Sequence, residues 1–81
     1  MLDKVQINRT IYKLERHDSG IAMYSLSYKE YPDKIIGFDV FVVNPDRFLP
    51  RDEDYGRSAF SWSTKDAAEK CFEELKKKLV N

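Results

Sequence analysis

The sequence predicts an α+β fold, a three- to four-stranded antiparallel meander with one C-terminal helix packed on one face, in the order β-β-β-(β)-α. Three observations predict it. Residues 64–80 carry the only strongly helical pattern in the chain. Earlier segments show the period-two alternation of half-buried strands, and short polar turns join them. Because a helix with one apolar stripe has to bury that stripe, the strands must supply the opposing surface.

The helix over residues 64–80 is predicted by its apolar residues, which recur at steps of three and four. They are Ala68, Cys71, Phe72, Leu75 and Leu79. Ser63 is the expected N-cap, because its hydroxyl can accept hydrogen bonds from the free N–H groups of the first turn. Lysines gather late in the segment, where they suit the negative end of the helix dipole.

The first strand-like segment covers residues 5–15. Its apolar residues change parity between Ile7 and Tyr12, which predicts a bulge or a register switch near residues 9–11. Residues 16–20 are polar and end in Gly20, which favours a turn. Residues 21–28 form the second strand, with Tyr24 on one face and Met23 on the other.

A turn over residues 31–34, which contains Pro32, leads to the third strand, residues 35–43. The near-continuous apolar character of this strand predicts a central place in the sheet, with Asp39 marking one face as partly wet. Residues 59–62 are a candidate short fourth strand that leads into the helix cap.

The connection over residues 44–57 is long for so small a domain. Loops of that length are usually functional or disordered, and Phe48, Leu49 and Tyr55 are apolar anchors that disfavour disorder. The segment is therefore a candidate interaction site, and whether it is functional or only structural stays open at this point. Its candidate interaction residues are Arg47, Arg51, Asp52, Asp54 and Tyr55.

Length and charge bound the possible functions. A chain of 81 residues has room for one domain, residues 1–81, with one modest core. Lys plus Arg number 14, as do Asp plus Glu, so the net charge of zero steers the protein towards neither nucleic acid nor membrane. The single cysteine excludes an internal disulfide. Because residues 1–4 are followed by no apolar run, we expect a cytoplasmic protein without membrane contact.

The sequence offers little catalytic chemistry. Asp52 and Asp54 begin the spacing of a calcium loop, but Gly56 stands where the next ligand is needed. His17 is the only histidine, which leaves no standard zinc site. We therefore expect a protein that is not an enzyme, with no catalytic residues, no metal, no cofactor and no evident small-molecule substrate.

A helix on one face of the sheet would leave the other face open. Four aromatic residues on the strands are candidate interaction residues for that face: Tyr12, Tyr24, Tyr28 and Phe41. An exposed apolar sheet face implies a protein partner or a second copy of the chain. We therefore expect a small non-catalytic binding or adaptor protein that acts through its open sheet face or through residues 44–57, with a homodimer as one form.

The alternative is a nucleic-acid-binding module. A sheet face that carries aromatic rings beside cations can stack bases and contact phosphates. The candidate nucleic-acid contacts are Arg9, Lys13, Arg16 and Lys29. Because the net charge is zero, the electrostatic attraction for phosphates would have to be local.

A sequence resemblance covers about the last thirty residues. Its residues are Glu53-Asp54-Tyr55-Gly56, then Ala59-Phe60-Ser61-Trp62, then Ala67-Ala68, Phe72 and Leu75. This pattern resembles that of small uncharacterised bacterial proteins, many of phage or mobile-element type, in which an acidic-aromatic-glycine turn precedes an aromatic strand and a closing helix. The resemblance implies a fold and an origin, and it implies no catalytic activity.

Overall fold

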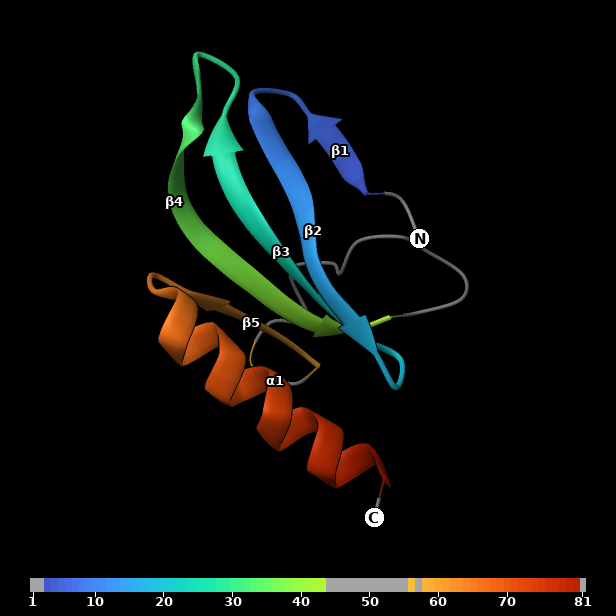
Figure 1. The fold of residues 1–81 in the computed structure, drawn as a ribbon. Helices are drawn as coiled ribbons and strands as arrows, with labels where there is room; N and C mark the ends of the chain where they lie inside the picture. The colour runs from blue at the N-terminus through green and yellow to red at the C-terminus, as the bar shows by residue number, and fades with distance from the viewer. Residues whose placement is uncertain (1–2, 44–55, 57, 81) are drawn as a thin grey trace.

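The described residues of the computed structural model, 3–43, 56 and 58–80, form one five-stranded antiparallel sheet with one helix packed on it (Figure 1). Side chains are described as far as residue 78. The sheet order β1-β2-β3-β4-β5 follows the chain, which confirms the α+β meander, with five strands instead of three to four. The elements are β1 (Lys4–Ile7), β2 (Thr10–Asp18), β3 (Ile21–Tyr28), β4 (Tyr31–Val42), β5 (Ala59–Trp62) and α1 (Lys65–Val80).

The additional strand comes from the first segment of the chain. The prediction of one strand with a register switch near residues 9–11 is wrong, because the chain reverses there and Ile7 pairs with Thr10. Asn8 takes a φ of 55° at this reversal, a conformation that asparagine tolerates better than most residues. The bulge lies further along, between Leu14 and Arg16.

The other two hairpin turns are also tighter than predicted. Strand β2 continues through Asp18, and the chain reverses at Ser19 and Gly20 with φ values of 55° and 79°, as the twist-compatible type I′ turn requires. The next reversal falls before Tyr31, which pairs directly with Tyr28. The predicted turn at residues 31–34 is therefore part of strand β4.

The main core lies between α1 and the sheet. Thr64, not Ser63, caps the helix, because its hydroxyl oxygen accepts a hydrogen bond from the Ala67 N–H at 3.3 Å. Helix α1 contacts β3, β4 and β5, and the predicted apolar stripe is buried as far as side chains are described; Leu79 lies beyond that limit. The core cluster comprises Ile21, Met23, Phe38, Val40, Ala68, Cys71, Phe72 and Leu75.

A second apolar cluster lies on the sheet face opposite the helix. The rings of Tyr24 and Phe41 stack there with centroids 5.7 Å apart, beside Ala22 and Ala59. Asp39 is on the same face, opposite Tyr24 in the register. The expectation that Asp39 marks a wet face is wrong, because its carboxylate is buried and accepts a hydrogen bond from the Ser61 hydroxyl at 2.7 Å.

Side chains of strand β2 form polar contacts with the helix. The guanidinium carbon of Arg16 lies 4.2 Å from the centroid of the Phe72 ring, within cation–π range. The same guanidinium donates a hydrogen bond to Glu73 at 2.9 Å. Further along, the Lys76 ammonium and the Asp18 carboxylate are 2.7 Å apart. These contacts orient the helix on the sheet.

The Asp18–Lys76 pair makes stability depend on pH. The hydrogen bond from Lys76, helped by one from Ser19, lowers the pKa of Asp18 below its usual 3.8. Because the folded-state pKa is lowered, the stabilisation is present above pH 3.8 and is lost as the pH falls through the folded-state pKa. We expect Asp18→Asn to lower the urea midpoint at pH 7, with the difference from wild type shrinking in acid. Asp33→Asn is the control, and an equal loss in it would contradict the assignment.

Cys71 is expected to react slowly. Burial raises the pKa of its thiol, and a hydrogen bond involving Trp62 offsets this only in part. Because the thiolate is the reactive form, we expect Ellman's reagent at pH 8 to modify the native protein much more slowly than the urea-unfolded chain. Equal rates in the two states would contradict the buried position.

Candidate functional site in the hairpin half of the sheet

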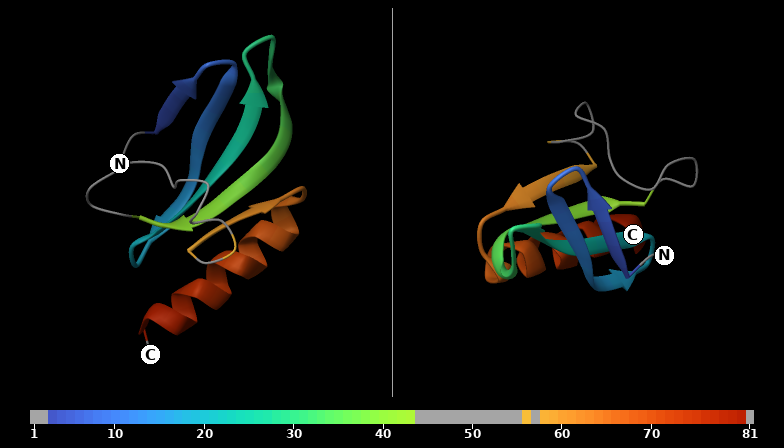
Figure 2. Two further views of the ribbon diagram at one scale, coloured as in Figure 1. Left: turned by 180° about the vertical axis from the view of Figure 1, so that it is seen from behind. Right: turned by 90° about the horizontal axis from the view of Figure 1, so that it is seen from above.

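The β1–β2 and β3–β4 hairpins extend past the helix at one end of the sheet (Figures 1 and 2). We call this part, residues 4–13 and 25–37, the hairpin half. The sheet residues of the core cluster beneath the helix, among them Met23 and Val40, lie outside it. A backbone hydrogen bond of 2.8 Å from the Lys29 N–H to the Arg9 carbonyl ties the two hairpin ends together. The sheet therefore projects as one platform with two faces.

One row of side chains crosses the platform on the face away from the helix. Ile7 pairs with Thr10, Thr10 with Tyr28, and Tyr28 with Tyr31. Directly paired residues of antiparallel strands place their side chains on the same face. The exposed fractions are 43% for Ile7, 49% for Tyr28 and 69% for Tyr31. Two neighbouring tyrosines and, beyond Thr10, an isoleucine are thus exposed in one row.

The next row of the same face contains Val5, Tyr12 and Leu26, which are half-buried. Burial raises the pKa of Tyr12, and the nearby negative charge of Asp39 adds to the effect. Beyond this row the face merges with the buried second cluster. We call the two outer rows the hairpin surface: Val5, Ile7, Tyr12, Leu26, Tyr28 and Tyr31.

The predicted aromatic site is thus divided by the structure. Tyr28 is displayed and Tyr12 is half-buried, so both belong to the hairpin surface. The expected display of Tyr24 and Phe41 is wrong, because these rings are fully buried in the second cluster, where they stack on each other. The remaining candidate interaction residues, Arg47, Arg51, Asp52, Asp54 and Tyr55, lie outside the described residues.

The cations of the nucleic-acid alternative do not gather beside these rings. Lys13 is paired with Ser25 on the helix side of the sheet, and Arg16 is held by Phe72 and Glu73. Arg9 forms an ion pair of 3.4 Å with Glu30. Lys29 is exposed at the hairpin end. These four cations therefore do not form a cluster next to the exposed aromatic rings, as stacking of bases beside phosphate contacts would need. Nucleic-acid binding stays a prediction.

Sequence reasoning missed two members of the hairpin row. Ile7 was placed inside a longer strand, and Tyr31 was placed in a turn because Pro32 follows it. The available signal was Asn8 between two β-rich runs, since asparagine favours the positive φ of a tight hairpin. A turn at Asn8 pairs Ile7 with Thr10, and the row then continues through Tyr28 to Tyr31.

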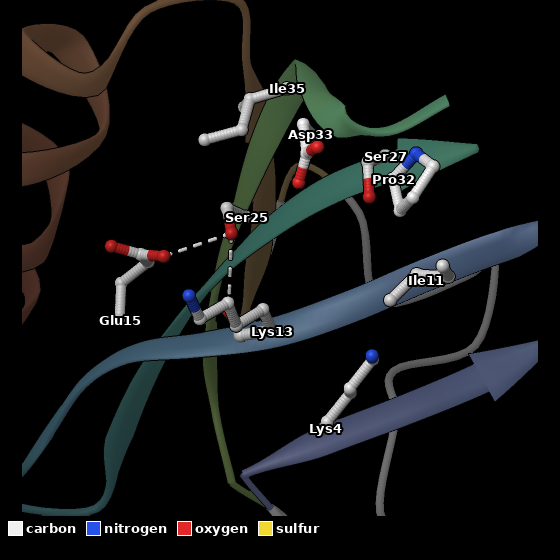
Figure 3. Close-up of a pocket in the computed structure, with 9 residues that line it drawn as sticks. All are labelled: Lys4, Ile11, Lys13, Glu15, Ser25, Ser27, Pro32, Asp33 and Ile35. Atoms are coloured by element: carbon white, nitrogen blue, oxygen red, sulfur yellow. Dashed lines mark hydrogen bonds between the residues drawn. The ribbon is translucent and has the colours of Figure 1, made fainter. Parts of the chain in front are cut away.

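A pocket of about 310 Å³ occupies the other face of the hairpin half, on the helix side (Figure 3). It is lined by Lys4, Ile11, Lys13, Glu15, Ser25, Ser27, Pro32, Asp33 and Ile35. Among these residues the sequence predicts a functional role only for Lys13, as a nucleic-acid contact. Two sites therefore lie back to back: an apolar surface on one face and a pocket of mixed chemistry on the other.

No group of three or more His, Cys, Asp or Glu side chains suited to holding a metal occurs among the described residues. In that part of the chain, no helix has the length and apolar character that crossing a membrane requires. Comparison of the chain with protein-family models, curated proteins and solved structures gives no match, so the resemblance to small bacterial and phage-type proteins stays a prediction and the geometry carries the functional argument.

Proposed function

We propose that this protein is a non-catalytic binding protein that associates through the hairpin surface and that its partner is a second copy of the chain. The observation that supports this proposal is the row of Ile7, Tyr28 and Tyr31, which are exposed on one sheet face, with Thr10 between Ile7 and Tyr28. Burying apolar surface contributes about 25 cal/mol per Å². Tyrosine is also enriched in protein interfaces, where its ring is buried and its hydroxyl finds a partner.

The platform is suited to association because it is already ordered. The Lys29–Arg9 backbone hydrogen bond and the Arg9–Glu30 ion pair hold the two hairpin ends in one arrangement. A preorganised surface loses less conformational entropy on binding than a flexible one. The hairpin surface therefore needs little rearrangement to meet a partner.

A second copy is favoured by charge and symmetry. The chain carries no net charge, so two copies do not repel each other over long distances. Most oligomers of a single chain are two-fold dimers in which one patch faces itself. A sheet face with apolar rows meets its own copy under that symmetry, with the Tyr28–Tyr31 pairs of the two copies in contact.

Sedimentation velocity over a concentration series tests the proposal. The chain has a mass of 9.6 kDa, and we expect the weight-average mass to rise towards twice that value as concentration increases. A mass of one chain at every concentration up to the millimolar range would contradict association with a second copy. An unchanged mass at high salt would be expected, because the contact is apolar and not electrostatic.

A further inference from the structure

Strand β3 changes chemistry along its helix-facing side. Ile21 and Met23 lie beneath the helix, and Ser25 and Ser27 follow where the helix no longer covers the sheet. Both serines are nonetheless buried, with exposed fractions of 4% and 6%. The floor of the pocket in the hairpin half therefore carries two serine hydroxyls. The equivalent positions nearer the start of β3 carry the core residues Ile21 and Met23.

The two hydroxyls differ in their partners. Ser25 donates to the Glu15 carboxylate at 2.9 Å, and the Lys13 carbonyl oxygen is 3.4 Å away. The Ser27 hydroxyl has no hydrogen-bond partner among the residues that the structure describes. It faces the pocket (Figure 3). A buried polar group without a partner is rare in folded proteins and calls for a ligand or water.

An irregularity in β4 builds one wall of the pocket. The register passes from Tyr28 opposite Tyr31 to Ser27 opposite Ile35, so β4 contains three more residues than β3 over this interval. The extra residues are Pro32, Asp33 and Lys34, of which the first two line the pocket. Strand bulges commonly re-aim side chains beside functional sites. Here the irregularity brings the Pro32 ring and the Asp33 carboxylate into the lining of the pocket that Ser27 also lines.

Four charged side chains line the pocket: Lys4 on β1, Lys13 and Glu15 on β2, and Asp33 on β4, and the Glu15 carboxylate already accepts the Ser25 hydrogen bond. Lys4 and Lys13 are directly paired across β1 and β2, so both side chains belong to the same face of the sheet. Among the described residues, neither ammonium forms an ion pair with a carboxylate, and the Asp33 carboxylate forms none with a lysine or arginine. All three side chains are exposed, so the lysines can reach an anion and Asp33 can reach a cation.

We propose that this pocket binds a small zwitterion with an aliphatic side chain, a ligand of the α-amino acid class. Its carboxylate lies between the Lys4 and Lys13 ammonium groups and accepts a hydrogen bond from the Ser27 hydroxyl. Its ammonium lies against Asp33. The aliphatic side chain packs on the apolar residues of the lining, which are Ile11 on β2 and Pro32 and Ile35 on β4. A volume of about 310 Å³ suits a ligand of this size, since small-molecule pockets start near about 300 Å³.

Titration of the ¹⁵N-labelled protein with L-leucine tests the site. We expect saturable amide shifts at Ser25, Ser27 and Asp33, with a dissociation constant in the millimolar range or tighter. Two analogues separate the charges: 4-methylpentanoate lacks the ammonium, and leucine amide lacks the carboxylate. Each should bind at least tenfold more weakly than leucine. Absence of saturation with leucine would overturn the proposal, and equal affinity for 4-methylpentanoate would overturn its zwitterionic part.

Variants assign the roles of the side chains. Lys13→Gln and Asp33→Asn should each weaken leucine binding at least tenfold, and Ser27→Ala severalfold. Lys29→Gln, which also removes an exposed lysine of the hairpin half, is the matched control and should bind as wild type does. Unchanged affinity in both Lys13→Gln and Asp33→Asn would overturn the assignment. Tyr31→Ser, on the opposite face, should leave leucine binding intact, so this site and the association of copies are tested separately.

Discussion

Replacing Tyr28 and Tyr31 together with serine is expected to yield a monomer at concentrations where the wild-type chain dimerises. Both rings are exposed in the free chain and would be buried at the centre of the contact. Truncating a tyrosine that is a hot spot of an interface costs at least about 2 kcal/mol, which is about a thirtyfold weaker association per residue. Sedimentation velocity on the double variant measures the loss, and circular dichroism checks that the sheet is retained.

The matched control is Ile35→Ser. Ile35 belongs to the same hairpin and is 53% exposed, but it lines the pocket on the helix side. It should therefore dimerise like wild type while weakening the binding of leucine. If Ile35→Ser dissociated the dimer as fully as the double variant did, the contact would not be the hairpin surface. A dimeric double variant would contradict the account in the same way.

Phe72→Ala is expected to have the largest effect on stability. The Phe72 ring is fully buried between α1 and the sheet and carries the Arg16 guanidinium on its face. Removing a buried phenylalanine side chain costs about 3–5 kcal/mol, which is a large part of the about 5–15 kcal/mol that stabilises a typical domain. Urea unfolding followed by circular dichroism should show a much lower midpoint.

Phe60→Ala provides the comparison for this substitution. Phe60 packs against the same cluster but is only partly buried, so the same chemical truncation should leave a smaller cavity and cost less. If Phe60→Ala lowered the free energy of unfolding as much as Phe72→Ala, the helix–sheet contact would not be the main source of stability. The difference between the two variants is more informative than either value alone.

The elements with strong periodicity could be predicted from the sequence. The stripe of Ala68, Cys71, Phe72 and Leu75 identified both the helix and its buried face. Alternation along residues 21–28 also separated the two faces of β3, since Met23 belongs to the core under the helix and Tyr24 to the opposite cluster. These predictions succeed because periodicity is a local property that tertiary contacts reinforce.

Turn positions could not be predicted in the same way. Asn8 and Ser19 reverse the chain through positive φ values, which composition alone does not require. Pro32 indicated a turn, whereas in the structure it occupies an irregular stretch of β4 beyond the part paired with β5, a place where the absence of an N–H is tolerated. The register of the sheet depends on these details, and it decides which residues form the hairpin row.

The candidate site was therefore predicted only in part. Alternation tells which residues share a sheet face, but it does not tell how much of that face is covered, which is why Tyr28 is displayed and Tyr24 is buried. The pocket depends on the pairing of Lys4 with Lys13 and on the irregularity that places Asp33 beside Ser27. These juxtapositions join four strands, so no short sequence pattern predicts them.

The most direct test of the central claim is a dilution series of ¹H–¹⁵N spectra, which reports where copies of the chain meet. If the hairpin surface is the contact, amide shifts of Ile7, Tyr28 and Tyr31 will change with concentration, and those of exposed helix residues such as Lys70 and Glu74 will not. Spectra that are independent of concentration, or changes confined to the helix, would contradict the account.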